Sequence, residues 1–519
     1  MDAHDVHPAA IIVFCVLFGV VAVGGFLAVR WRRADLSQLN EWGLAGRRFG
    51  TWVTWFLIGG DIYTAYTFIA VPAAMFGTGS AGFFAFAYTT LVFPVLFVFG
   101  PRLWAVCRRH GYITAADFVR GRFDSSSLAL ATAFTGILAT MPYIGLQLVG
   151  LKTVIAAMGI SGDWPVIIAF VILAAYTFQS GLRAPALTAV IKDLIIYVTV
   201  IVAVIYIPIK LGGFGHIFGA AHASLAKATP PAATVPGLDS SYETYATLAL
   251  GSAFALFLYP HALTGALSAD SGNTIRRNAA LLSTYSLMLG AIAVMGYMAI
   301  AAGLKPSNPN FAVPDLFIKY FPPWFEGFGF AAIGVGALVP AAIMSIAASN
   351  LFSRNIWATY IRPAADDREQ TLVAKIASLF VKVGALCFAL FVSTSSSIDL
   401  QLLGGVWILQ TLPAVFLGLY TRWFDRWALL GGWAVGMGLG TWMSVSQSFS
   451  SAFPLNVGSI HLTMYSAFFA IAANLVVTIV LTPVTRRLDP RQRVDETLPD
   501  DYDDVAAAAD GGRPELVSA

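Results

Sequence analysis

Long apolar segments alternate with short polar connections along almost the whole chain. A helix needs about 20 apolar residues to cross a hydrocarbon core about 30 Å thick. We identify thirteen segments of that kind, near residues 10–29, 50–76, 81–106, 126–158, 164–182, 187–209, 246–268, 278–303, 327–352, 373–392, 401–420, 427–446 and 460–483. The pattern predicts an all-α integral membrane protein with about thirteen transmembrane helices.

The positions of lysine and arginine support this topology, because short cytoplasmic loops are enriched in both residues. With the N-terminus outside, most of the 31 lysine and arginine residues fall in alternate, inside connections, and Lys192 is among them. The opposite side has only Lys210, Lys227, Lys305 and Lys319, while Lys152 and Lys382 lie within spans. We therefore expect a multi-pass protein of the cell inner membrane, with an outside N-terminus and a cytoplasmic C-terminus.

The composition changes little in this picture but excludes several classes. Hydrophobic residues make up 58% of the chain and charged residues 11%, whereas soluble proteins have about 25% charged residues. A net charge of +3 gives no indication of a nucleic-acid partner. Cys15, Cys107 and Cys387 are far apart and have no histidine at metal-ligand spacing, so we expect no disulfide framework, zinc site or cofactor. The first apolar segment follows an acidic flank and is not expected to be a signal peptide.

The spans suggest a division of the chain into five regions. We expect an N-terminal helix and an inner basic loop (1–49), a first repeat of five helices (50–209), a second repeat (246–420), two C-terminal helices (427–483) and a disordered cytoplasmic tail (486–519). The inner segment YITAADFVRGRF is expected to start a short helix at Thr114, with Asp117 as its capping-box partner.

One aspartate stands out in the second span, LIGGDIYTAYTFIAVPA. A carboxylate near the bilayer centre costs about 2.5–3.5 kcal/mol on insertion scales, so such a group usually faces a cavity or a partner. Gly59 and Gly60 precede Asp61 and Pro72 follows it, which predicts an interrupted helix. Non-helical backbone at this depth is tolerated only where it lines a cavity or is buried in protein.

A second span, GSAFALFLYPHALTGALSA, has the same weakness. Gly251 and Ser252 come early in it, and Pro260 and His261 follow. In transporters built from inverted repeats, two interrupted helices at matching places mark the site of solute and ion. Each interrupted span here begins a block of five helices, so we expect Asp61 to lie at an unwound centre where a solute and a cation bind.

Other roles for these residues stay open. Asp61 could make only an interhelical hydrogen bond, His261 could satisfy a carbonyl freed by the proline, and Lys152 could reach the membrane interface. An intramembrane aspartyl protease needs two facing carboxylates, and the sequence shows no second deep aspartate. Its GxGD motif would also need glycine at position 58, where this chain has Ile58. A membrane sensor or channel is a further alternative.

These motifs resemble the sodium/solute symporter family over roughly residues 8–485. The resemblance rests on GGDIYTAYTFIAVPA, YITAADFVRGRF, SGLRAPALTAVIKD, YPHALTGALSADSGNTIRRNAA and LVPAAIMSIAASNLFSRNIW. Within the family, the first and last motifs are most similar to bacterial monocarboxylate permeases. The resemblance implies a LeuT-like core of two inverted five-helix repeats, with one N-terminal and two C-terminal helices, and a transporter rather than an enzyme.

The family's sodium site combines backbone carbonyls of the interrupted first core helix with hydroxyls of core helix eight. Carried over by motif, the ligands are the carbonyls of Gly59 and Ile62 and the hydroxyl of Ser345. The second hydroxyl position is Ile346, and the aspartate often found on core helix five is replaced by Ala189. Ser349 lies one turn beyond Ser345 and could compensate. Otherwise Asp61 could carry a proton.

The resemblance implies import of pyruvate, lactate, acetate or propionate with a coupling cation, by alternating access; another small solute, such as proline, a sugar or a different organic acid, is the alternative. Helix N-termini at the two breaks offer partial positive charge to an anion. Lys152 is expected to be the only basic side chain near the site and below the surface. The residues expected to bind substrate are Asp61, Thr64, Tyr66, Thr67, Tyr143, Gln147, Lys152, Tyr259 and His261.

Overall fold

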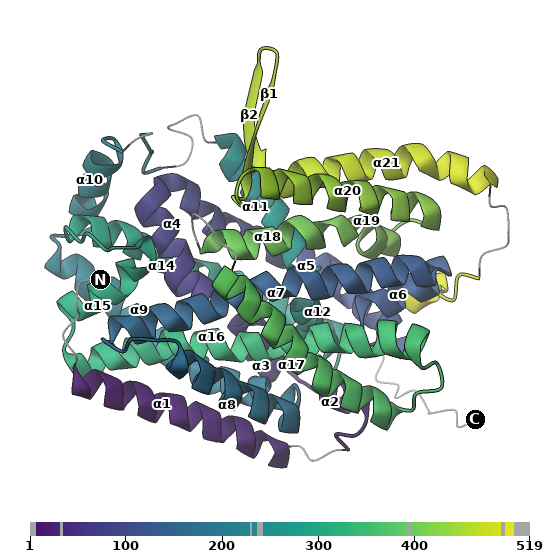
Figure 1. The fold of residues 1–519 in the computed structure, drawn as a ribbon, viewed down its shortest axis with the longest axis horizontal. Coiled ribbons are helices and arrows are strands. Elements are labelled where there is room, and N and C mark those ends of the chain that lie inside the picture. Colours follow the sequence, from purple (N-terminus) through teal and green to yellow (C-terminus); the bar gives the residue numbers. More distant parts are fainter. Residues whose placement is uncertain are drawn as a thin grey trace.

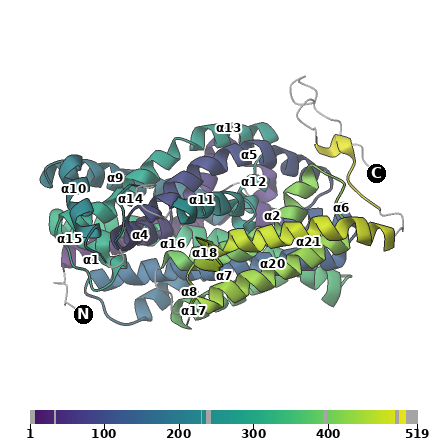
Figure 2. The same cartoon turned by 90° about the horizontal axis from the view of Figure 1, so that it is seen from above.

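The fold of this chain is a bundle of long helices running roughly side by side (Figure 1). The computed structural model describes residues 7–31, 35–228, 231–235, 242–391, 397–488 and 494–502. The apolar runs form helices because a helix satisfies its own backbone polar groups where no water can do so. The start of α1, α10 and α15 lie toward one end of the bundle, while α6 and residues 494–502 lie at the other (Figures 1 and 2).

In the described residues of the first half of the chain there are ten α-helices. Their bounds are α1 (Pro8–Leu27), α2 (Leu39–Leu44), α3 (Thr51–Gly60), α4 (Val71–Thr78), α5 (Phe84–Arg109), α6 (Ala115–Phe123), α7 (Ser126–Ala157), α8 (Trp164–Ser180), α9 (Arg183–Lys210) and α10 (Phe214–Leu225). Shorter 3-10 or π turns join them at η1 (Ala28–Arg30), η2 (Ala45–Arg47), η3 (Tyr66–Ala70) and η4 (Gly79–Phe83).

The second half contains the remaining helices and one hairpin. The α-helices are α11 (Tyr242–Leu256), α12 (Pro260–Leu267), α13 (Gly272–Leu282), α14 (Tyr285–Ala301), α15 (Ala312–Tyr320), α16 (Pro323–Leu351), α17 (Asp367–Phe391), α18 (Ile398–Ile408), α19 (Leu412–Val415), α20 (Arg426–Ser446) and α21 (Ser466–Leu488). The short turns are η5 (Pro309–Phe311), η6 (Phe352–Ile361), η7 (Leu409–Thr411), η8 (Leu417–Leu419) and η9 (Pro499–Tyr502).

The number of membrane spans is close to, but not the same as, the predicted thirteen. Within the described ranges, nine helices are long and apolar enough to cross a membrane, and the number reaches eleven if each of two bent pairs is one span. One of the nine, Tyr66–Arg109, joins parts of two predicted spans, and the apolar Trp164–Ser180 is shorter. The exact count of thirteen therefore stays a prediction.

Both predicted helix interruptions are confirmed. The first span stops at Gly60 and resumes in helical form at Tyr66. The second consists of α11 and α12, which are bent by 49° at the break before Pro260. The predicted helix start at Thr114 is also confirmed, because the Thr114 hydroxyl accepts from the Asp117 amide and the Asp117 carboxylate accepts from the Thr114 amide.

Two segments differ from the sequence-based expectation. Residues 460–465, predicted to begin the last span, form a strand of the hairpin β1 (Ala452–Val457) and β2 (Ile460–Tyr465), which projects from the bundle (Figure 1). Ala452 pairs with Tyr465, and Val457 pairs with Ile460 across a two-residue turn. The last helix therefore begins at Ser466.

The second difference concerns the predicted disordered tail. Arg486 and Arg487 belong to the last turn of α21, and residues 494–502 contact the basic connections that the charge pattern predicts to lie inside. The Glu496 amide donates to the Gly121 carbonyl at 3.0 Å, and Asp501 lies 2.7 Å from His110. Burial raises the pKa of Asp501, but hydrogen bonds from His110 and the Leu498 amide outweigh it and hold this pKa below its ordinary value. Residues 489–493 and 503–519 lie outside the described residues.

Candidate functional site

The first helix break is built from two glycines and a short non-helical turn. Asp61 is the C-cap of α3 and its side chain is buried. A side chain at Gly59 would meet Leu282 Cδ2 at 2.9 Å, and one at Gly60 would meet Lys192 Nζ at 3.2 Å. The two glycines therefore let α9, α13 and α14 approach the backbone directly in front of Asp61.

Side chains satisfy the backbone groups that this break releases. Gln147 Oε1 on α7 accepts from the Ala65 amide at 3.0 Å. Thr64 Oγ1 accepts from the Tyr66 amide at 3.0 Å, and Thr67 Oγ1 donates to the Ile62 carbonyl at 2.7 Å. The structure thus places Thr64, Thr67 and Gln147 at the break, with their polar atoms bonded to its backbone; contact with a substrate stays a prediction.

The second break lies beside the first, because α12 packs against α3. Tyr259 has extended backbone geometry and precedes Pro260, which is the first residue of α12. The Tyr259 hydroxyl donates to the Gln401 carbonyl of α18 at 2.9 Å. Its ring is therefore held in a fixed position at the N-terminal end of α12.

Asp61 and His261 meet where the two breaks come together. Asp61 Oδ2 lies 3.5 Å from His261 Nε2, and the two side chains are 7% and 0% exposed. The His261 ring lies 5.4 Å from that of Tyr143 and 5.2 Å from that of Tyr259. This cluster is the candidate solute site, since it combines a carboxylate, an imidazole and two aromatic walls at the centre of the fold.

Several polar atoms of this cluster have no hydrogen-bond partner in the part of the chain that the structure describes. Among the described residues, Asp61 Oδ1 and both ring nitrogens of His261 are buried without a hydrogen bond. The alternative that His261 satisfies a carbonyl freed by Pro260 is therefore wrong. Buried polar groups normally have partners, so atoms of this kind at a helix break are suited to a transported solute or to water. Tyr66, also predicted here, is buried with its ring 6.3 Å from that of Tyr88.

The predicted cation ligands are buried, and each of them makes a hydrogen bond within the protein. The Gly59 carbonyl accepts from the Ile62 and Tyr63 amides at 3.0 and 3.3 Å. The Ile62 carbonyl accepts from Thr67, as described above. On α16, Ser345 Oγ donates to the Ala342 carbonyl at 2.9 Å and Ser349 Oγ to the Ile346 carbonyl at 2.8 Å.

Lys152 does not lie with the cluster, and this corrects its predicted placement. Its side chain is 54% exposed and pairs with Asp163 at 2.7 Å, near the start of α8. Lys192, which the charge pattern assigned to an inside connection, is instead fully buried on α9 and donates to the Gly60 and Tyr63 carbonyls. The buried basic side chain beside the first break is therefore Lys192.

A second deep aspartate also exists, contrary to the sequence-based expectation. Asp193 is fully buried; it pairs with Lys192 and accepts from the Tyr285 hydroxyl at 2.9 Å. An aspartyl protease needs two carboxylates that share a proton. Asp193 is bonded instead to an ammonium and a phenol, which does not match that requirement.

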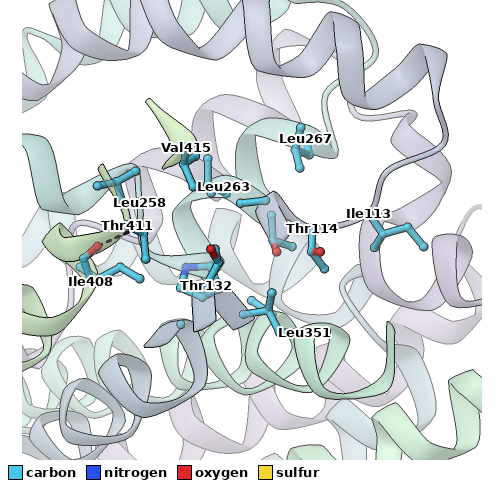
Figure 3. Close-up of a pocket in the computed structure, with 15 residues that line it drawn as sticks. Ile113, Thr114, Thr132, Leu258, Leu263, Leu267, Leu351, Ile408, Thr411 and Val415 are labelled. Carbon is cyan, nitrogen blue, oxygen red and sulfur yellow. Dashed lines mark hydrogen bonds between the residues drawn. The ribbon is translucent and has the colours of Figure 1, made fainter. Parts of the chain in front are cut away.

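A narrow cavity leads from the second break toward the N-terminal end of α6 (Figure 3). Its volume is about 20 Å³, which is room for about one water molecule. Leucine and isoleucine side chains from several helices converge on it, and threonine hydroxyls are spaced along it (Figure 3). Its lining comprises Ile113, Thr114, Ala115, Thr132, Gly136, Leu258, Pro260, Leu263, Thr264, Leu267, Ala347, Leu351, Ile408, Thr411 and Val415.

Comparison with known proteins places this site in a wider context. Residues 42–436 match the model of the sodium:solute symporter family. A monocarboxylate transport permease protein of Rhizobium johnstonii is 51% identical over 92% of this chain and 97% of that protein. The uncharacterized symporter YodF of Bacillus subtilis is 33% identical over 92% and 93%, and the sodium/proline symporter of Escherichia coli is 23% identical over 73% and 76%.

Solved structures with the same fold include two cation-coupled symporters. A Na⁺-coupled sialic acid symporter in a substrate-bound outward-open state aligns with a TM-score of 0.73 and 16% identity over 92% of this chain and 98% of that one. Mhp1, a nucleobase-cation-symport-1 transporter, aligns with a TM-score of 0.53 and 11% identity over 89% and 98%. The predicted LeuT-like fold class is confirmed.

Proposed function

Since this chain belongs to the sodium:solute symporter family, we propose that it imports short-chain monocarboxylates such as pyruvate, lactate, acetate and propionate across the inner membrane. The observation that carries this proposal is the 51% identity, over nearly the full length of both proteins, to a relative named as a monocarboxylate permease. The partners are the small organic acid, a coupling cation and the bilayer.

The geometry of the two breaks supports a small, partly apolar anion as the solute. The N-terminal end of α12 carries partial positive charge, and His261 in its first turn has two buried ring nitrogens without a hydrogen bond among the described residues. The rings of Tyr143 and Tyr259 lie 5.5 Å apart beside it. A carboxylate head facing α12 and a short carbon chain packed against the rings would satisfy both features.

Transport by alternating access agrees with the narrow cavity in Figure 3. A cavity of about 20 Å³ is too small for a monocarboxylate. A solute at Asp61 and His261 could therefore leave along it only if α12 and the helices around it move. Coupling to a cation requires that the cation and the solute favour the same conformation.

The test is uptake of labelled pyruvate, lactate and acetate into proteoliposomes, with sodium and proton gradients imposed separately. We expect saturable uptake of at least one of these acids that exceeds uptake into protein-free liposomes and is driven by one of the two gradients. Uptake of proline or a sugar, with none of the three acids, would contradict the proposed substrate class.

A further inference from the structure

The Lys192 ammonium is surrounded by oxygen atoms at the first helix break. Its Nζ atom lies 2.7 Å from Asp193 Oδ1, 2.7 Å from the Gly60 carbonyl and 3.0 Å from the Tyr63 carbonyl. Two of its three N–H donors bond to the carbonyls, and the carboxylate oxygen lies in ion-pair contact beside them. The side chain is fully buried, and the three contacts together satisfy a charge that would be very costly to bury alone.

These oxygens belong to the stretch where the family resemblance predicts a coupling cation. Hard cations such as sodium take oxygen ligands, and backbone carbonyls at an unwound helix are typical ones. Here the Gly60 and Tyr63 carbonyls hold Lys192, while the neighbouring Gly59 and Ile62 carbonyls accept hydrogen bonds from the Tyr63 amide and from Thr67. The positive charge of Lys192 beside these carbonyls would repel a sodium ion, so the residues present do not fit one.

Two substitutions remove other oxygen ligands from the same place. Ile346 occupies the second hydroxyl position of α16, and Ala189, one turn before Lys192, packs against Val335 and Val339 of α16. The chain thus lacks two oxygen ligands that the family resemblance implies for sodium, and it carries a positive charge at the first break.

We propose that Lys192 is a tethered cation that takes the place of an inorganic cation at the first helix break, so that solute transport needs no sodium. This inference rests on the proposed function as a transporter of this family. In this proposal the Lys192 ammonium excludes sodium from the break, and Asp193 and Tyr285 are the residues that position it.

The surrounding groups are arranged to keep the ammonium where it is. Tyr285 donates to Asp193 Oδ2, and the Tyr63 hydroxyl donates to the Tyr285 carbonyl. Gly60 has no side chain that would push against Nζ, since a Cβ atom there would lie only 3.2 Å from it. Asp61 also attracts Lys192 electrostatically. The ammonium therefore links α9 to the break itself.

A simpler role for Lys192 would be a structural link between α9 and α3, with no effect on which cation binds. The two roles differ in what happens when the ammonium is removed. In Lys192→Ala, the Asp193 carboxylate and the two carbonyls would face an open space of cation size. If Lys192 is a tethered cation, sodium should then bind there. If it is only a structural link, the variant should simply be less stable.

The experiment compares sodium with potassium at equal ionic strength, for purified wild type and Lys192→Ala. For the wild type we expect the same thermal unfolding midpoint and the same pyruvate uptake in both salts. For Lys192→Ala we expect sodium to raise the midpoint in a saturable manner and to increase uptake about tenfold over potassium, which corresponds to about 1.4 kcal/mol. Lys210→Ala, at the exposed end of the same helix, is the matched control and should behave as the wild type.

Saturable stabilisation of the wild type by sodium, or an uptake that falls tenfold without it, would overturn the proposal. A well-folded Lys192→Ala that ignores sodium in both measurements would do the same. If that variant does not fold, the unfolding midpoint of the wild type in the two salts decides alone. Absence of monocarboxylate uptake under every gradient would count against the proposed function, while the unfolding midpoints would still test Lys192.

Discussion

Asp61 is the residue whose position is hardest to explain by folding alone. Its carboxylate is almost fully buried, its Oδ1 atom has no hydrogen bond among the described residues, and its other oxygen is 3.5 Å from His261. A buried polar atom without a partner costs about 1–3 kcal/mol. A role in binding solute or cation at the break gives a reason for keeping that cost.

We therefore expect Asp61→Asn to reduce pyruvate uptake at least about tenfold, a loss of about 1.4 kcal/mol in transition-state stabilisation, with normal membrane insertion. The amide keeps the size of the side chain and removes its charge. Uptake is measured per molecule inserted, and Asp35→Asn on an exposed inner connection is the control. An equal loss of insertion and uptake would show a folding role instead.

At the scale of single residues, sequence could identify candidates but not their depth. Lys192 follows Arg183 by nine positions in α9, which places it roughly 13 Å along the helix axis at 1.5 Å per residue. Two adjacent charged residues, Lys192 and Asp193, suggest the end of a helix, but α9 already begins at Arg183. Lys152 shows the opposite error, since its flexible side chain reaches the exposed Asp163.

At the scale of elements, the two interrupted spans are joined where α3 begins and α12 ends. Phe49, just before α3, donates to the Ser268 carbonyl and accepts from the Asp270 amide, at 3.2 and 2.9 Å. Trp104 of α5 donates to the Ala269 carbonyl between them at 2.9 Å. Because these bonds connect α3 to α12, the two helices are suited to move as one body when the narrow cavity widens for a solute.

The first break depends on α7 as well as on its own residues. Gln147→Leu would leave the buried Ala65 amide without its acceptor, and we expect it to lower the free energy of unfolding by about 1–3 kcal/mol. Thermal unfolding in detergent measures this effect. Thr153→Val on the same helix is the control, because the Thr153 hydroxyl bonds only to the Val149 carbonyl of its own helix. Equal midpoints for the two variants would show that Gln147 does not hold the break.

The hairpin shows where a strand signal was hidden by hydrophobicity. Gly458 and Ser459 form the two-residue turn between β1 and β2, and Gly458 has φ +60°. A glycine followed by serine between two short runs is typical of such a turn. The residues that follow are apolar enough to resemble the start of a span, so the hydrophobic pattern predicts that β2 is part of the last helix.

At the scale of the whole molecule, the helical bundle and its two breaks could be predicted because each has a strong local cause. Apolar length predicts the spans, and Gly59, Gly60 and Pro260 predict the breaks. The contacts of residues 494–502 could not be predicted, because they depend on basic residues far away in sequence. One of these, Arg122, is buried and pairs with Asp495 at 2.5 Å.

The central claim is that this bundle carries a monocarboxylate across the membrane by alternating access around the two breaks. Counterflow tests it most directly: proteoliposomes loaded with unlabelled pyruvate are diluted into labelled pyruvate without any ion gradient. We predict that label accumulates transiently above its equilibrium level with the wild type and does not with Asp61→Asn. Label that only rises to equilibrium with the wild type, as through a channel, would contradict the account.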